Sequence, residues 1–332
     1  MLRTVDRITL SHGAGGQAMC DLIESVFLAA YGSSDALRDD SAVIGDLAFT
    51  TDSFVVSPIF FPGGDIGRLA ISGTVNDLLT VAARPVAIAA SFIIEEGLEV
   101  DILNRVAESM RATADECGVK IVTGDTKVVP RGSADKLFIT TTGIGRVMRP
   151  GVSGASARPG DAVILTGTVG DHGAAVMLAR ENLLNAVEVE SDVAPLVEIV
   201  VNLVESGCEV HTMRDPTRGG IGSALNEIAL QSGTAIQIDE SLISIRPPVR
   251  AACEALGIDP YYMASEGRML IITSPQDAQK VLDVIRSSRY GENAAIIGEV
   301  HPTPAGRVLV RTAIGTSRIL TKPSGELLPR IC

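Results

Sequence analysis

The segment DDSAVIGDLAFTTD, residues 39–52, predicts the β-hairpin around which the first half of the chain is organised. Two short apolar runs, 41–44 and 47–50, flank Gly45-Asp46, a two-residue turn of the type that joins adjacent antiparallel strands. Pairing about this turn fixes which side chains share each end of the ladder. The hairpin therefore decides where the acidic residues beside it gather.

Three carboxylates meet at one end of this hairpin, because the pairing brings Asp39 and Asp40 beside Asp52. Carboxylates this close repel one another unless a cation or hydrogen-bond donors lie between them. Mg²⁺ that bridges phosphate groups is one solution, since it prefers hard oxygen ligands. A solvated hairpin end is the alternative, because aspartate is common at protein surfaces.

The segments that follow alternate between helix and strand. Residues 66–83 predict an apolar helix, 86–94 a buried strand, and 100–117 an amphipathic helix. Turn formers cluster at 149–161, and a second mixture of strands and helices follows. We therefore expect a two-domain α/β or α+β architecture. Its parts would be an N-terminal domain at 1–150, a C-terminal domain at 151–310 and a flexible tail at 311–332.

Asn76 and Asp77 stand inside the predicted helix 66–83. One turn before and after Asp77 lie Gly73 and Val81, so its stripe of the helix is small or apolar. A carboxylate there is either buried with a partner or turned toward a site, because burying it unpaired is costly. Isolated buried acids often mark functional sites, which favours the second interpretation.

A glycine-rich turn, Gly13-Ala14-Gly15-Gly16, precedes a predicted helix. Exposed backbone N–H groups in such a turn can bind phosphate groups. The dinucleotide-binding pattern is matched only loosely, since no clear strand comes before the turn, and a plain helix-entry turn is the alternative. No G-x-x-x-x-G-K-[ST] motif occurs, which excludes a P-loop.

Gly124-Asp125-Thr126-Lys127 follows a predicted strand at 119–123. A strand that ends in Gly-Asp-Thr is a common place for a metal or phosphate contact, and Lys127 adds a cation. An Asx turn with an exposed lysine is the alternative. Two further segments mix charge with turn formers, Arg214–Gly220 and Ser265–Gly267, and each is a weak signal by itself.

The composition excludes several classes of protein. The net charge of −12 disfavours binding to nucleic acid or to anionic membranes. The five cysteines contain no C-x-x-C pair, so they indicate neither a disulfide framework nor a zinc site. No apolar run is long enough for a membrane span or a signal peptide, and we expect a soluble cytoplasmic protein.

Cys332 is the last residue of the chain, where a frayed end with an incidental cysteine is the ordinary interpretation. A thiol beside the terminal carboxylate is not activated, because negative charge raises a thiol pKa. Reactivity would therefore require that the end of the chain dock into a site with its own cation or base.

Together these motifs resemble the HypE family of hydrogenase maturation proteins, which are carbamoyl dehydratases. That family belongs to the superfamily of aminoimidazole ribonucleotide synthetase, selenophosphate synthetase and thiamine-monophosphate kinase. The resemblance extends over essentially the whole chain and ends in Pro329-Arg330-Ile331-Cys332, which points to this family among its relatives. The internal motifs that carry it are Ser11–Gly16, Asp39–Val43, Thr51–Ser53, Thr74–Leu78, Gly124–Lys127, Arg214–Gly220 and Ser265–Gly267.

The resemblance implies ATP-dependent dehydration of an S-carbamoyl group on Cys332 to a thiocyanate, which donates cyanide to iron for a nickel–iron hydrogenase. It implies a homodimer in which the N-terminal domains close a β-barrel, each chain adding a C-terminal α/β sandwich-like domain. The implied partners are the carbamoyltransferase HypF, which loads Cys332, and a HypC–HypD complex, which receives the cyanide. The implied cofactors are ATP and Mg²⁺.

By the same similarity, site roles fall on three groups of residues. The catalytic group would be Cys332, Glu266, Lys127 and His12, with Glu266 as the base. The metal ligands would be Asp40, Asp52, Asp77 and Asp125. The nucleotide would contact Gly13, Gly15, Gly16, Asn76, Thr126 and Asp215.

Two other functions compete with this one. A superfamily synthetase of the selenophosphate type carries a reactive cysteine or selenocysteine just before its glycine-rich turn, whereas Ser11-His12 stand there in this chain and Cys20 lies beyond. A non-enzymatic ATP-binding scaffold is the second alternative, and the retained acids and Lys127 argue against it.

Overall fold

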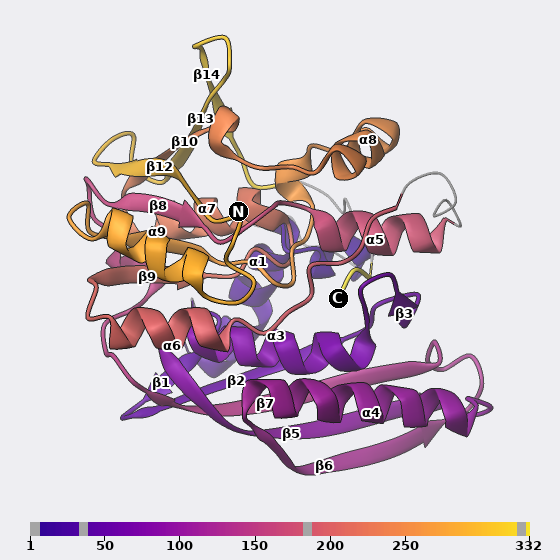
Figure 1. The fold of residues 1–332 in the computed structure, drawn as a ribbon. Helices are drawn as coiled ribbons and strands as arrows, with labels where there is room; N and C mark the ends of the chain where they lie inside the picture. Colours follow the sequence, from indigo (N-terminus) through magenta and orange to yellow (C-terminus); the bar gives the residue numbers. More distant parts are fainter. Residues whose placement is uncertain (1–6, 33–38, 182–187, 324–329) are drawn as a thin grey trace.

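The structure is a computed structural model that describes residues 7–32, 39–181, 188–323 and 330–332. Two β-sheets dominate it, one formed by the first half of the chain and one by the second (Figure 1). Within the described residues, no helix is both long and apolar enough to cross a membrane.

The first sheet has five strands in the order β1-β2-β7-β5-β6. The predicted hairpin is confirmed, since Ile44 pairs with Leu47 across the turn. Only the β5–β6 pair is parallel; the others are antiparallel. The strands are β1 (Ala42–Ile44), β2 (Leu47–Phe54), β5 (Ala83–Glu95), β6 (Lys120–Val129) and β7 (Leu137–Val147), and a separate small ladder joins β3 (Phe60–Phe61) to β4 (Gly64–Asp65).

Helices α3 (Ile66–Thr80) and α4 (Val100–Cys117) cover one face of this sheet (Figure 1). The Asp65 side chain begins α3 by accepting hydrogen bonds from the backbone N–H groups of Gly67 and Arg68. Almost all of α3 is buried, because it lies between the sheet and the second half of the chain. The predicted apolar helix is thus the central element of the molecule.

The second sheet has seven strands in the order β14-β13-β10-β12-β8-β11-β9. Its strands are β8 (Ala162–Leu165), β9 (Val210–Arg214), β10 (Ala235–Asp239), β11 (Leu270–Thr273), β12 (Ala295–His301), β13 (Arg307–Arg311) and β14 (Ser317–Leu320). Its helices are α5 (Asp171–Arg180), α6 (Val197–Glu205), α7 (Gly220–Ser232), α8 (Pro247–Leu256) and α9 (Ala278–Ser287). At the N-terminus, η1 (Leu10–Gly13), α1 (Gln17–Leu22), the π-helical η2 (Ile23–Leu28) and α2 (Ala29–Tyr31) follow one another.

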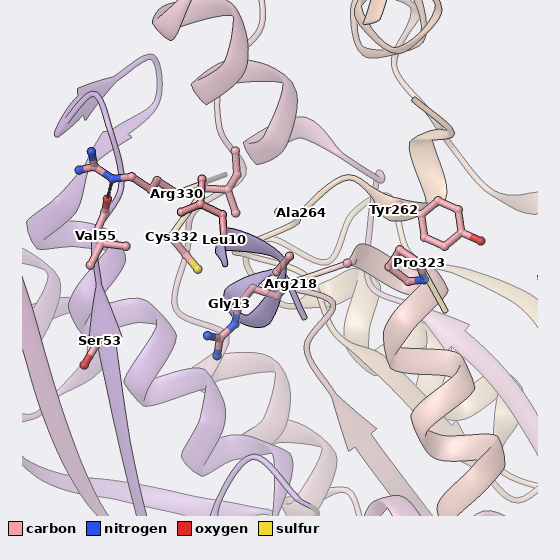
Figure 2. Close-up of a pocket in the computed structure, with 13 residues that line it drawn as sticks. Leu10, Gly13, Ser53, Val55, Arg218, Tyr262, Ala264, Pro323, Arg330 and Cys332 are labelled. Carbon is pink, nitrogen blue, oxygen red and sulfur yellow. Dashed lines mark hydrogen bonds between the residues drawn. The ribbon is translucent and has the colours of Figure 1, made fainter. Parts of the chain in front are cut away.

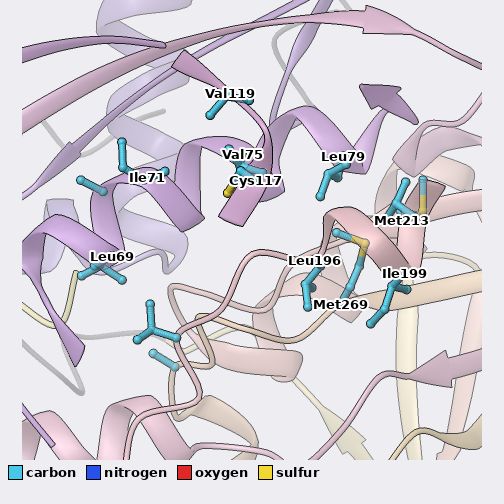
Figure 3. Packing of buried hydrophobic residues seen from close by; sticks show 14 of the residues in the cluster. Leu69, Ile71, Val75, Leu79, Cys117, Val119, Leu196, Ile199, Met213 and Met269 are labelled. Carbon is cyan, nitrogen blue, oxygen red and sulfur yellow. The ribbon is translucent and has the colours of Figure 1, made fainter. Parts of the chain in front are cut away.

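One hydrophobic core joins the two halves. Val75 and Leu79 of α3 belong to the same buried cluster as Leu196 and Ile199 of the second half (Figure 3). Beside them the Asn76 side chain accepts a hydrogen bond from the Leu196 N–H at 2.9 Å and donates one to the Ala194 carbonyl at 3.0 Å. The two sheets are therefore packed through α3 as one body.

The structure corrects three sequence-based expectations. The strand predicted at 119–123 does not turn at Gly124; it continues to Val129, because pairing with β5 outweighs the turn preference of Gly-Asp-Thr. Strands β9 and β13 were not expected. The predicted tail at 311–332 begins with part of a sheet, since β14 pairs with β13, while its residues 324–329 lie outside the described residues.

Candidate active site

The end of the chain lies between the two halves and lines a cavity of about 180 Å³ (Figure 2). The backbone N–H of Val55, just after β2, donates a hydrogen bond of 2.9 Å to a terminal carboxylate oxygen of Cys332. Figure 2 shows the Cys332 sulfur turned toward the part of the cavity where the Arg218 guanidinium lies. Cys332 is thus an ordered part of the site in this structure.

An acidic cluster lies next to this cavity. Asp52 comes from β2 and Asp77 from α3, and Asp215 directly follows β9. Thr50 Oγ1 donates to Asp77 Oδ2 at 2.8 Å and to the Asp40 carbonyl at 3.0 Å, which ties the hairpin end to α3. Strand register and helix position therefore bring together acids that are far apart in the sequence.

Two acids of this cluster, Asp77 and Asp215, resist ionisation. Burial raises the pKa of Asp77 well above its usual value, and the nearby charges of Asp215 and Asp52 raise it further. Burial raises the pKa of Asp215 to about 8, with Asp40 adding to the effect and Arg214 opposing it. Such a cluster favours the arrival of positive charge, because a cation would stabilise the ionised forms.

Asp40 has a cation of its own. Arg214 Nη2 lies 3.1 Å from Asp40 Oδ1 and 2.9 Å from Glu227 Oε2. Burial raises the pKa of Asp40, and Arg214 opposes that shift. Asp40 is therefore partly neutralised within the protein, in contrast to Asp77.

Glu266 and Arg218 face Cys332 from the second half. Glu266 Oε1 is buried and makes no hydrogen bond among the described residues, and burial raises the pKa of this side chain well above normal. Burial also raises the pKa of the Cys332 thiol to about 12, although Arg218 opposes that shift. In the docked position Cys332 is thus a neutral thiol that lies near the buried Glu266 carboxyl group and the Arg218 guanidinium.

Arg218 was not among the sequence-predicted site residues. It lies 3.9 Å from Asp52 Oδ1, and its pKa is raised first by its interaction with Cys332. It supplies the cation that reactivity at Cys332 was expected to require. Its position directly before the N-terminus of α7, in the charged turn 214–220, was the only signal in the sequence.

The glycine-rich turn reaches the same cavity. Gly13 and Ala14 line it, while a side chain on Gly15 would clash with Arg218 at 2.6 Å. Gly15 also has a φ of +74°, which a side chain would strain. The predicted Gly13, Gly15 and Gly16 therefore lie at the site, whereas His12 bonds through Nδ1 to Thr9 at the entry of the turn.

Asn76, which was predicted to contact the nucleotide, makes hydrogen bonds to the second half of the chain in this structure. Its side chain is 1% exposed, and its amide is committed to backbone groups of the second half, including the Glu266 carbonyl at 3.4 Å. These hydrogen bonds hold the two halves of the molecule together. Asn76 therefore links α3 to the second half of the chain.

Asp125, Thr126 and Lys127 do not join the acidic cluster of their own chain. They lie on β6, the outermost strand, where Asp125 and Lys127 form an exposed ion pair of 2.7 Å. Gly124 is in register with Asp52 across the sheet but three strand spacings away, or roughly 14 Å. The bond to Lys127 lowers the pKa of Asp125, the reverse of the shift at Asp77.

No three Asp, Glu, His or Cys side chains converge closely enough to hold a metal ion by themselves in the described part of the chain. Asp40, Asp52 and Asp77 nevertheless carry carboxylate oxygens, which are hard metal ligands. Burial and neighbouring acids raise the pKa of Asp40 and Asp77. Such a set suits a cation that arrives with phosphate oxygens, because Mg²⁺ is usually held by one or two carboxylates together with substrate phosphates.

Comparison with known proteins gives consistent results. Residues 38–147 match the family of AIR synthase related proteins, N-terminal domain, and residues 158–311 match the C-terminal domain of the same family. Carbamoyl dehydratase HypE of Rhizobium leguminosarum bv. viciae is 49% identical, over 98% of this chain and 95% of the relative. A crystal structure of a HypE–HypF complex matches with 46% identity and a TM-score of 0.87, covering 91% of this chain and 99% of the other. A crystal structure of hydrogenase maturation protein HypE in complex with ATP matches with 46% identity and a TM-score of 0.84, covering 98% and 100%.

Proposed function

This chain belongs to the HypE family of carbamoyl dehydratases, and from that premise we propose that it uses ATP to dehydrate an S-carbamoyl group on its own Cys332. The observation that carries the proposal is the position of Cys332, whose sulfur borders a cavity shared with Arg218 and the glycine-rich turn. The reactive group of such an enzyme would be part of the enzyme itself.

The reaction balances as the loss of one water, driven by ATP. The carbamoyl oxygen attacks the γ-phosphorus of ATP and ADP leaves. The carbon–oxygen bond then breaks and releases phosphate, while the nitrogen loses two protons and forms the nitrile. Phosphorylation is required because an amide oxygen is a poor leaving group, and positioned cations stabilise the transferring phosphoryl group.

Glu266 is the proposed base. A base that acts near neutral pH needs a pKa raised well above that of free glutamate, and burial supplies that shift here. Its unpartnered Oε1 leaves an acceptor available for a nitrogen-bound proton. Arg218, which faces Cys332, would hold negative charge that develops on the carbamoyl oxygen.

Mg²⁺ would bind with the nucleotide at Asp40, Asp52 and Asp77, and Asp215 lies close enough to raise the pKa of Asp77. When bound, the ion would neutralise phosphate charge. Asp77 and Asp215 resist ionisation without a cation, which supports a metal that enters together with ATP. Gly13, Gly15 and Gly16 would lie near the phosphates, and His12 would act from the entry of the same turn.

Asp125, Thr126 and Lys127 would serve the site of a second copy in a homodimer. Strand β6 is exposed along nearly its whole length, and a ten-residue edge strand of this kind is normally covered. The sheet face opposite α3 and α4 also leaves apolar side chains in water. These include Phe49, Val86, Ile93 and Ile144. A β-barrel closed between two such sheets would cover both features and carry the β6 motif toward a partner's nucleotide.

The wider setting is also proposed. A HypF carbamoyltransferase would load Cys332, a HypC–HypD complex would accept the cyanide on iron, and the reaction would take place in the cytoplasm. A complex of HypE with HypF has been crystallised for a relative, which supports the first partner. The domain limits of 1–150 and 151–310 remain our proposal.

The decisive experiment measures the mass of the C-terminal peptide. Incubation with a HypF loading partner, carbamoyl phosphate and ATP should add a carbamoyl group to Cys332 and then convert it to a cyano group. Cys332→Ser should bind ATP normally and show neither mass shift. The assignment would be refuted if the wild-type peptide remained unmodified while the loading partner was shown to be active.

A further inference from the structure

Each of the last three residues is bound through a backbone carbonyl or carboxylate oxygen. His172 Nε2 lies 2.8 Å from the Ile331 carbonyl, and Arg180 Nη2 donates to the Arg330 carbonyl at 2.8 Å. The Ser57 N–H donates to the same Arg330 carbonyl at 3.3 Å. With the bond from Val55 to Cys332, a contact therefore reaches the carbonyl or carboxylate oxygen of every residue in the segment.

His172 is fixed in the form that can donate to the chain end. Its Nδ1 lies 2.8 Å from Ser191 Oγ, and that hydroxyl accepts from the Val193 N–H at 3.0 Å. The hydroxyl proton is thus available for Nδ1, and the Ile331 carbonyl can only accept, so the network assigns the imidazole proton to Nε2. Burial lowers the pKa of His172 to about 4, which keeps the ring neutral near pH 7.

Arg180 connects the chain end to the first half of the molecule. It is the last residue of α5, and its Nε donates to the Ser57 carbonyl at 2.9 Å. One guanidinium thus bridges the carbonyls of Ser57 and Arg330, which belong to distant parts of the chain. The planar guanidinium suits this bridge because its N–H donors have fixed directions, whereas a lysine ammonium would act as a single point charge.

The Arg330 side chain completes the attachment. Its Nε donates to the Val55 carbonyl at 2.9 Å, and its Nη1 pairs with Asp135 at 2.6 Å. None of these contacts ends on the sulfur of Cys332, which faces the cavity instead. The group that the sulfur carries is therefore not among the features by which the chain end is held.

We propose that His172 and Arg180 are positioning residues of a docking clamp that binds the backbone of the Arg330–Cys332 segment and seats it whatever group the sulfur carries. The proposal rests on the proposed function only in taking Cys332 as the carrier of that group. Thiol, carbamoyl and cyano forms would all dock, so the clamp aligns the substrate without selecting the reaction stage.

The test measures how fast Cys332 reacts with iodoacetamide, in a Cys20→Ser background because the other three cysteines are buried. His172→Met and Arg180→Met should each speed labelling of the C-terminal peptide about fivefold, the effect of losing one hydrogen bond. His172→Gln should restore slow labelling, since its amide can donate to Ile331, and Arg180→Lys should restore it only in part.

Controls separate docking from general destabilisation. Arg84→Met removes an exposed ion pair elsewhere and should leave the labelling rate unchanged. ATP affinity and the unfolding temperature should change little in Arg180→Met, whose side chain lies at a helix end. Labelling at the wild-type rate in both Met variants would overturn the clamp, whatever the outcome of the carbamoyl mass experiment. Faster labelling without any carbamoyl or cyano product would instead sustain the clamp and reject the proposed function.

A second experiment tests whether docking is independent of the group that the Cys332 sulfur carries. Prolonged treatment of the same Cys20→Ser protein places a carboxamidomethyl group, an amide close in size to a carbamoyl group, on Cys332. Carboxypeptidase should then release the modified and unmodified residues at similar rates. If the modified residue were released more than about tenfold faster than the unmodified one, the attached group would be displacing the segment. A change of that size exceeds the effect of losing a single hydrogen bond.

Discussion

Asp77 is half-buried on the central helix α3, whereas Asp125 is exposed on the outermost strand of the first sheet. The two side chains respond oppositely to these surroundings. Burial and neighbouring acids raise the pKa of Asp77, while Lys127 lowers that of Asp125. The half-buried acid without a paired cation can stabilise an incoming positive charge, whereas the exposed acid is already neutralised by its lysine partner.

The largest effect should come from the interior. Asp77→Asn should reduce ATP hydrolysis on the order of a hundredfold, the scale expected when one stabilising group is removed from a phosphoryl-transfer site. Asp46→Asn, which alters an exposed ion pair in the turn of the hairpin, is the matched control and should leave the rate unchanged. Steady-state hydrolysis assays measure both. Equal background rates in wild type and Asp77→Asn would favour a non-enzymatic scaffold.

The exterior motif can be tested by mixing two inactive variants. If Asp125 serves the partner's site, a mixture of Asp77→Asn and Asp125→Asn chains contains mixed dimers with one intact site. Random assortment in a two-fold dimer should then restore about a quarter of the wild-type rate. The measurement is ATP hydrolysis after the variants are mixed under conditions that allow subunit exchange. A mixture as inactive as its components, despite demonstrated exchange, would place Asp77 and Asp125 in one chain's site.

The smallest effect concerns pH and stability. Folded Asp215 keeps its proton up to about pH 8, whereas the unfolded residue titrates near 3.8. The folded state thus binds the extra proton, and the stability it gives is lost as the pH rises through 8. Between pH 6.5 and 8, above the titration of His172, the unfolding temperature without nucleotide should fall by roughly a few degrees.

Two variants sharpen that measurement. Asp215→Asn should make the decline of the unfolding temperature shallower, because the Asp215 proton is no longer there to be released. Asp125→Asn should leave the slope unchanged, since Asp125 is ionised in both the folded and unfolded states there. A steeper slope in Asp125→Asn than in wild type would contradict the assignment of the effect to the buried cluster.

The sequence predicts most of the elements that position the site, because their signals are local. The hairpin about Gly45-Asp46 and the helix Val100–Cys117 depend on turn preference and on the spacing of nearby apolar residues. Asp77 was recognised because a carboxylate in an apolar stripe is unusual, and the structure brings it next to the cavity. Local patterns therefore sufficed for this part of the site.

The missing parts depend on contacts between distant segments. Strand β9 contains His211, Thr212 and Arg214, which are buried but polar, so it lacks the apolar alternation of a strand. His211 is satisfied by Asp161 at 2.7 Å, fifty positions away. Strand β9 is stabilised by hydrogen bonds to distant polar residues. It therefore lacks the alternating apolar residues by which a strand is predicted from sequence.

The hydrogen bonds of Asn76, His172 and Arg180 could not be predicted from the sequence for the same reason. Each makes its main hydrogen bonds to backbone carbonyls more than a hundred residues away in the sequence. A backbone carbonyl has no residue identity, so it leaves no signal in a sequence. The role of these side chains becomes visible only when the end of the chain has been placed.

Ile331 is 4% exposed and belongs to the core that the two sheets share. If the end of the chain leaves this position to be loaded, as we propose, the Ile331 side chain passes into water and leaves a cavity behind it. Transfer of an isoleucine to water costs about 2 kcal/mol, which favours the seated end roughly thirtyfold at rest. A partner that loads Cys332 outside the cavity would offset this cost by offering an apolar pocket to Ile331.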